Sequence, residues 1–299
     1  MKKIKELIIN FINGFCMALA DSVPGVSGGT IAFILGFYDN FITSLDDIFR
    51  GNWEKKKKAF IYLIKIGIGW AIGFVIAAFV LANLFNTKIY QMSSLFLGFI
   101  IFAIPLIIKE EKDSFKGKYK NIVFTFIGIA FVVAIAVFSS NASFNIDLQN
   151  LNIGTLVYVF FVAMIAISAM ILPGISGSTI LLIFGIYIPI MNCIKAFLGF
   201  DFSVFPILFT FGLGILAGVI IFARIARKCL EKHRSPTVCA ILGLMIGSIY
   251  SIVLGPTTLE EPKAMMDLST FSVIFFIIGG AIIIGLEALK NILNKNKQN

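Results

Sequence analysis

Two short segments combine proline, glycine, serine and threonine in a pattern that could bind an anion. The first motif is Pro24-Gly25-Val26-Ser27-Gly28-Gly29-Thr30, and the second motif is Pro173-Gly174-Ile175-Ser176-Gly177-Ser178-Thr179. In each, the proline is expected to end a helix and the glycines to let the chain turn, so that a new helix begins at the threonine. The N–H groups at a helix start attract phosphate or carboxylate. The residues expected to contact a phosphate group are Gly25, Ser27, Gly28, Gly29, Thr30, Gly174, Ser176, Gly177, Ser178 and Thr179.

A purely structural role is the alternative for both motifs. The glycines would then allow two helices to cross closely, and the hydroxyl groups of the serines and threonines would cap backbone groups that the break leaves unpaired. No metal or cofactor is expected. The four cysteines show no metal-ligand spacing and are expected to be buried free thiols.

The elements that carry the motifs are expected to be membrane helices. Hydrophobic residues make up 59% of the chain and the mean hydropathy is +0.97, well above the values of soluble proteins. Several apolar stretches approach or exceed the roughly 20 residues that a helix needs to cross the hydrocarbon core. The sequence therefore predicts an all-α polytopic membrane protein that forms a single membrane domain.

The chain also contains an internal repeat. From Pro24 to Tyr38, nine of fifteen positions are identical to the segment Pro173–Tyr187, at an offset of 149 residues. Gly69 and Gly73 recur as Gly214 and Gly218, a spacing typical of closely packed membrane helices. The matches are collinear, so residues 1–148 and 149–299 are interpreted as two copies of one unit.

The positive charges give these two copies opposite orientations. The charge of +9 is concentrated at both termini and in the connections 50–58, 109–120 and 224–234. The positive-inside rule places these parts, and hence both termini, in the cytoplasm, so the charge does not imply a nucleic-acid partner. Inverted repeats with a binding site at their interface are typical of secondary transporters.

Each repeat is expected to hold one re-entrant helical hairpin and three transmembrane helices. The helices 7–20 and 30–45 of the first hairpin would be only about 21 and 24 Å long, too short to span comfortably; two full spans per hairpin is the alternative. The expected elements are hairpin 7–45 with spans 59–85, 94–108 and 121–139, and hairpin 153–192 with spans 203–223, 237–253 and 269–289.

Two charged residues stand out near the motifs. Asp21 precedes the first motif, whereas Met170 occupies the same place before the second. A carboxylate at membrane depth is costly and is often functional, so Asp21 is expected to couple transport to an ion or to act in gating; a helix cap or ion pair is the alternative. Lys65 is a candidate countercharge for an anionic headgroup, or it extends to the cytoplasmic surface.

The chain resembles the PopT-type polyprenyl-phosphate transporter family of prokaryotes over essentially its whole length. The resemblance is carried by the two motifs, together with Ala20-Asp21-Ser22-Val23 before the first motif and Leu172 before the second. The resemblance implies a flippase in the cytoplasmic membrane that returns undecaprenyl phosphate, the carrier lipid of peptidoglycan and cell-wall biogenesis, from the outer to the inner leaflet. H⁺ or Na⁺ is the expected coupling ion.

Two other functions compete with lipid transport. A small-anion or ion-coupled solute transporter could use the same two motifs. An intramembrane lipid phosphatase is less favoured, because it would need a cluster of Glu residues, an Arg and usually a Ser or His nucleophile near the phosphate. Neither motif contains an Arg, and His233, the only histidine, lies in a basic connection. The sequence therefore predicts no catalytic residues and no enzymatic activity.

Overall fold

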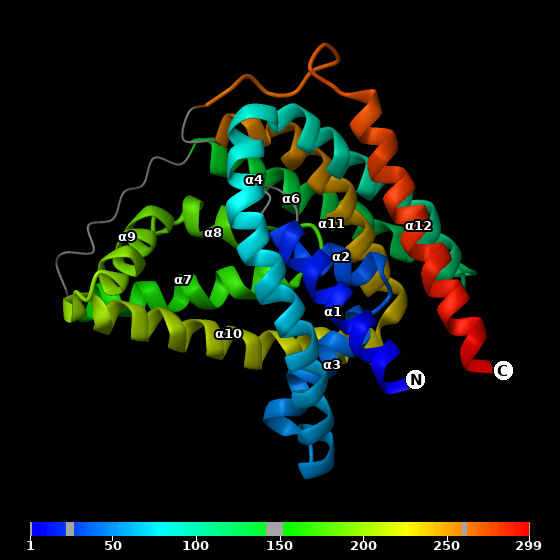
Figure 1. Cartoon of the computed structure of the whole chain (residues 1–299), viewed down its shortest axis with the longest axis horizontal. Helices are drawn as coiled ribbons and strands as arrows, with labels where there is room; N and C mark the ends of the chain where they lie inside the picture. The colour runs from blue at the N-terminus through cyan, green and yellow to red at the C-terminus, as the bar shows by residue number, and fades with distance from the viewer. Residues whose placement is uncertain (1, 22–26, 142–151, 259–261, 299) are drawn as a thin grey trace.

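The computed structural model describes residues 2–21, 27–141, 152–258 and 262–298, and every regular element in these ranges is helical (Figure 1). The all-helical fold expected from the sequence is confirmed. The first half of the chain contains α1 (Lys2–Asp21), α2 (Gly28–Ile34), α3 (Tyr38–Arg50), α4 (Trp53–Glu110), α5 (Lys112–Phe115), the 3-10 turn η1 (Tyr119–Ile122) and α6 (Val123–Asn141). The second half contains α7 (Ile153–Ile171), α8 (Gly177–Ile183), α9 (Tyr187–Leu198), the 3-10 turn η2 (Phe202–Val204), α10 (Phe205–Lys232), α11 (Arg234–Leu254), the 3-10 turn η3 (Gly255–Thr258) and α12 (Val273–Gln298).

Six helical segments are long and apolar enough to cross a membrane: Trp53–Ala77, Lys88–Glu110, Tyr119–Phe138, Ile153–Ile171, Phe202–Lys232 and Arg234–Thr257. Helices α8 and α9 form a further broken segment, bent by 107°. Large apolar side chains are exposed along these helices, as expected where lipid replaces water. The chain is therefore a multi-span membrane protein.

The two spans expected at 59–85 and 94–108 both belong to α4, which is kinked between them at the non-helical residue Lys88. One detail of the expected elements is wrong. The single helix expected over residues 30–45 is two helices, α2 and α3, separated by Gly36. Gly36 has a φ of +72°, which glycine adopts without steric cost.

The same turn occurs in the second half. The N–H of Gly36 donates to Phe33, and the N–H of Phe37 donates to Ala32. The equivalent pair consists of Gly185 donating to Leu182 and Ile186 donating to Leu181, and Gly185 has a φ of +66°. Both breaks are helix C-caps of the Schellman type, built around a left-handed glycine.

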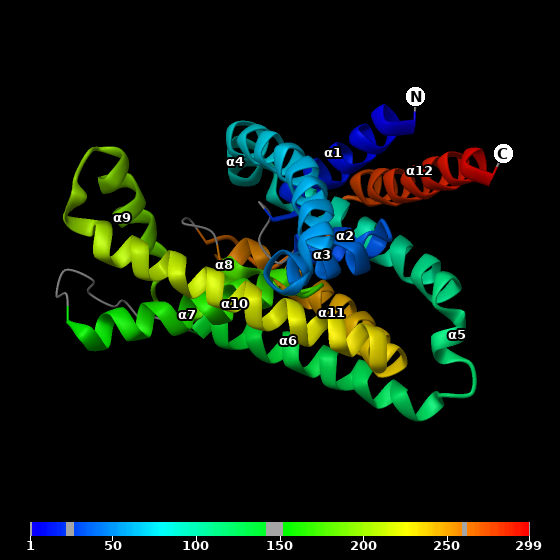
Figure 2. The ribbon, with the colours of Figure 1, turned by 90° about the horizontal axis from the view of Figure 1, so that it is seen from below.

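Close helix crossings also recur in matched positions. A Cβ atom on Gly69 of α4 would lie closer than 3.0 Å to the backbone of Phe11 in α1, and one on Gly214 of α10 would lie equally close to Phe160 in α7. Helix α1 thus lies along α4 as α7 lies along α10 (Figures 1 and 2). These contacts confirm the close packing that the glycine spacing predicts.

The two halves interlock through another matched pair of crossings. Gly98 of α4 packs on Phe276 of α12, and Gly243 of α11 packs on Thr125 of α6. Each crossing joins one half of the chain to the last long helix of the other half. Because neither half completes its packing alone, the two halves form one membrane unit around the two motifs.

Candidate anion site

The two motifs lie against each other in the interior of the molecule. The Ser27 hydroxyl is 2.9 Å from the carbonyl oxygen of Leu172 and 3.0 Å from that of Met170, and it donates to this pair of acceptors. The N–H of Gly174 donates to Thr30 Oγ1 at 2.7 Å. Ser27 and Thr30 are each only 1% exposed. The structure therefore brings the two motifs together across about 145 residues of sequence.

Glycine is needed at this contact because backbone meets backbone. A Cβ atom on Gly29 would collide with the carbonyl group of Ile171, at the end of α7. Gly174 has a φ of +87° and packs in the same way on Leu244 of α11. In the first motif, Ser27, Gly29 and Thr30 thus hold the two breaks together, which is the structural role considered as the alternative for these residues.

The carboxylate of Asp21, the last residue of α1, lies at the start of α2. Its Oδ1 atom accepts a hydrogen bond from the N–H of Gly28 at 2.7 Å, and its Oδ2 atom accepts one from Trp70 Nε1 at 2.9 Å. The next N–H group, that of Gly29, donates to Ser27 Oγ at 3.1 Å. A carboxylate of the chain itself therefore lies where the sequence suggested that a bound anion would lie.

The second motif lacks this internal carboxylate. Met170 stands in the place of Asp21, and its Cβ atom is 3.1 Å from the position of a Cβ on Gly177. The hydroxyl groups of Ser176 and Ser178 are 2.7 Å apart and bond to each other. The half-buried Thr179 makes no side-chain hydrogen bond within the described part of the chain. The second motif therefore holds three hydroxyl groups that have no charged partner within the described residues.

The remaining expected site residues do not join this group. Lys65 Nζ pairs with Glu6 Oε1 at 2.9 Å, near the beginning of α1, whereas Asp21 ends that helix. Gly25 lies outside the described residues. Trp70 is a partner that sequence reasoning missed. An indole N–H in a membrane span needs an acceptor, and this rule could have linked Trp70 to the nearby helix that carries Asp21.

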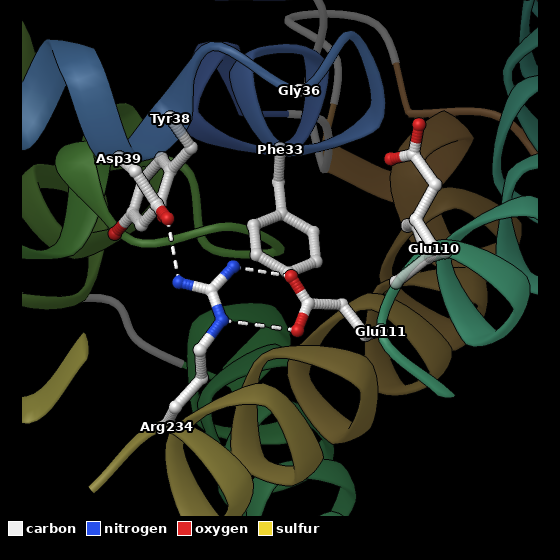
Figure 3. Close-up of a pocket in the computed structure, with 8 residues that line it drawn as sticks. Phe33, Gly36, Tyr38, Asp39, Glu110, Glu111 and Arg234 are labelled. Carbon is white, nitrogen blue, oxygen red and sulfur yellow. Dashed lines mark hydrogen bonds and ion pairs between the residues drawn. The ribbon is translucent and has the colours of Figure 1, made fainter. Parts of the chain in front are cut away.

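A second polar group lies where the halves meet near the ends of α4 and α10. A cavity of about 120 Å³ is lined by Phe33, Gly36, Tyr38, Asp39, Ile107, Glu110, Glu111 and Arg234 (Figure 3). Arg234 Nη1 donates to Asp39 at 2.5 Å, and Nε and Nη2 donate to the two oxygens of Glu111. Burial alone would raise the pKa of Glu111, but hydrogen bonds from Arg234 and Ser114 outweigh it and lower the pKa.

The fold and these contacts define a polytopic helical membrane protein with two broken helices in contact at its centre. Residues 17–270 match the model of a family described as VCA0040-like, undecaprenyl phosphate translocase-like. The chain belongs to this family.

Two relatives with curated names support this assignment. One is a polyprenyl-phosphate transporter of Staphylococcus aureus, 36% identical over 257 residues, which covers 84% of this chain and 87% of the relative. The other is a polyprenyl-phosphate transporter of Vibrio cholerae, 31% identical over 264 residues, which covers 84% of this chain and 79% of the relative. No solved structure gives a significant match.

Proposed function

We propose that this protein transports a polyprenyl phosphate, such as undecaprenyl phosphate, across the cytoplasmic membrane from the outer to the inner leaflet. Two relatives named polyprenyl-phosphate transporters, aligned over most of the chain, support this substrate class. The hydroxyl groups of the second motif lie at a helix break between the two halves and have no charged partner among the described residues. This is the structural observation on which the proposal rests.

The second motif is the proposed contact for the phosphate headgroup. Ser176, Ser178 and Thr179 can donate to phosphate oxygens, and hydrogen bonds to a charged group stabilise by about 1.5–3 kcal/mol each. Gly177 leaves room for an oxygen to approach the backbone. The first motif contributes mainly by fixing the second, because Ser27 and Thr30 already bond to its backbone.

Asp21 is the proposed coupling residue. It holds the N–H of Gly28 and the indole of Trp70, so uptake of a proton or a cation at its carboxylate would weaken contacts that join α1, α2 and α4. Such a change would reach the second motif through Ser27 and Thr30, whose helix begins at Gly28. The expected coupling ion is H⁺ or Na⁺.

The proposed topology has two inverted halves, with both termini in the cytoplasm. The matched crossings of Gly69 with Phe11 and of Gly214 with Phe160 support a two-fold relation between the halves. The basic connections lie at one end of the fold, because Arg227 and Arg234 pair with α3 and with the end of α4. A common basic end fits the cytoplasmic side of a membrane.

Reconstituted vesicles test this function. Purified protein is placed in liposomes that contain undecaprenyl phosphate, and a non-permeant phosphatase measures how fast the headgroup moves between leaflets. We expect the variant Ser176→Ala/Ser178→Ala/Thr179→Val to lower this rate about tenfold or more, as the loss of one charged hydrogen bond predicts. Ser168→Ala, which removes a hydroxyl bonded within α7, is the matched control. Uptake of free inorganic phosphate without lipid movement would instead establish a small-anion transporter.

A further inference from the structure

Helices α3 and α9 are equivalent in the repeat but are packed differently. Each follows a short helix and a left-handed glycine, at a sequence offset of 149 residues. One face of α3 is formed by Tyr38, Ile42 and Asp46, which are 2%, 0% and 8% exposed. The equivalent face of α9 is formed by Tyr187, Met191 and Lys195. Tyr187 is half-buried, Met191 is 40% exposed and Lys195 is exposed.

The buried face of α3 packs on the other half of the chain. Tyr38 and Ile42 belong to an apolar cluster that includes Ala226 and Leu230 of α10 and Ile241 of α11. Helix α9 instead makes its main contacts with α8, α10 and η2, all in its own half, and Figure 1 shows α9 beside α7 and α10, at the edge of the molecule. One of two equivalent helices therefore bridges the halves, and the other leaves the same face open.

Ion pairs fasten α3 at both of its ends. Arg227 Nη1 of α10 lies 3.0 Å from Asp46 Oδ2 and 2.6 Å from Asp47 Oδ1. Arg234 of α11 pairs with Asp39 in the first turn of α3, as Figure 3 shows. The side chains of Asp46 and Asp47 are only 10% and 17% exposed, so water screens their pairs with Arg227 less than it screens surface pairs.

Three further charged groups take part in these ion pairs. Arg50 Nε lies 3.7 Å from Asp46 Oδ1, and Glu231 accepts a hydrogen bond from Arg227 Nε at 2.8 Å. Glu111 shares Arg234 with Asp39. Each of the two arginines thus joins a carboxylate of α3 to a second carboxylate on α10 or beside α4.

The start of α3 also borders the cavity beside α2. Tyr38 and Asp39 line this cavity together with Phe33 and Gly36, which belong to the break that follows the first motif. Movement of α3 away from α10 and α11 would therefore open a path from the basic end of the protein toward the motifs. Equivalent elements in two alternative packings are a recurrent basis of conformational switching.

We propose that Arg227 and Arg234 lock α3 as a gate at the basic end, and that the face of α9 formed by Tyr187, Met191 and Lys195 closes the opposite end when this lock opens. This inference rests on the proposed function, because a transporter must expose its site to the two sides alternately. The structure represents the state that is closed at the basic end. In the alternative state, α9 packs against the first half as α3 now packs against the second.

Cysteine accessibility tests this proposal without any lipid substrate. The four native cysteines are first replaced by alanine, and a single cysteine is placed at Ile107, which lines the cavity and is 2% exposed, or at the exposed Lys195. Modification by a charged thiol reagent is then compared with and without Arg227→Gln/Arg234→Gln. We expect modification at position 107 to become about tenfold faster and modification at position 195 to become slower. A tenfold change corresponds to about 1.4 kcal/mol.

Two controls separate gating from loss of the fold. Arg224→Gln removes an exposed charge from α10 and should change neither rate. Arg227→Asp should open the gate, and Arg227→Asp/Asp47→Arg should restore the original rates by reversing the pair. Unchanged rates at both positions would overturn the proposal, as would a rise at position 107 with no fall at position 195. A reciprocal change in a protein that fails to move polyprenyl phosphate would support the gate and refute the lipid assignment.

Discussion

Trp70 donates its indole N–H to the carboxylate of Asp21 at 2.9 Å, and this bond joins the first span, Trp53–Ala77, to the last residue of α1. The same carboxylate receives the N–H of Gly28 at the start of α2. Asp21 thus connects three helices directly before the first motif. Its counterpart Met170 carries no carboxylate, so the two halves differ in charge at the point where their motifs meet.

Substitution of Asp21 tests its proposed coupling role. Asp21→Asn keeps the size of the side chain and an oxygen acceptor but removes the charge. We expect the rate of transport in reconstituted vesicles to fall and to lose its dependence on the pH or Na⁺ gradient. Trp70→Phe removes one hydrogen-bond donor and should lower the rate while the gradient dependence remains. Transport by Asp21→Asn that responds to gradients as the unmodified protein does would remove Asp21 from the coupling mechanism.

The serines of the two motifs should give different effects when they are changed. Ser27→Ala removes bonds that hold the motifs together, so it should lower the thermal stability in detergent, by about 1–3 kcal/mol in free energy for the buried partners left unsatisfied. Ser176→Ala removes a proposed headgroup contact and should lower transport with a smaller effect on stability. The reverse pattern would show that the first motif, rather than the second, contacts the headgroup.

The glycines of the helix crossings offer matched pairs on the same helix. Gly69→Ala in α4 and Gly214→Ala in α10 should each destabilise the protein by about 1–3 kcal/mol, because the new methyl group meets backbone atoms of the neighbouring helix. Gly67→Ala and Gly212→Ala place the same group where no atom of a neighbouring helix lies within 4 Å. These two variants should therefore keep the original thermal unfolding temperature or raise it slightly. Equal effects at all four positions would contradict the crossing geometry.

The pairing of Glu111 with Arg234 predicts a defined dependence of stability on pH. The pKa of Glu111 is lowered in the folded protein, so its charged form stabilises the fold above the ordinary value of 4.5, and this stabilisation is lost as the pH falls through the lowered pKa. Glu111→Gln should therefore unfold at a lower temperature than the unmodified protein at pH 7. The difference should shrink well below pH 4.5. A difference that grows on acidification would contradict the assignment.

The features that could be predicted from the sequence depend on local or repeated signals. Continuous apolar stretches predict the membrane helices, and glycine spacing predicts that α4 and α10 pack closely on other helices. The spacing does not show that these partners are α1 and α7. The helix break at Gly36 was missed, because the segment from Ile31 to Tyr38 contains only apolar and aromatic residues apart from this one glycine. A comparison of Gly36 with Gly185 could have revealed it, because both glycines precede a tyrosine by two residues.

The site could be predicted only in part, because its chemistry depends on which distant residues meet. Periodicity does not show that Ser27 bonds to Leu172, 145 residues away, or that Arg227 binds Asp47, 180 residues away. The first motif has the composition of an anion site, but its donors are already bonded to Asp21 and to the chain itself. The absence of a carboxylate at Met170 was visible in the sequence, and its consequence for the second motif became clear from the structure.

Exposure of undecaprenyl phosphate on the outer leaflet of living cells is the most direct measure of the proposed function. Cells that lack this protein and any redundant flippase are labelled with a non-permeant probe of the phosphate headgroup. We expect the lipid to accumulate outside in these cells and to return to its normal level with the unmodified protein or with Ser168→Ala. It should stay high with Ser176→Ala/Ser178→Ala/Thr179→Val. Equal exposure with and without the protein would contradict the transport of this lipid.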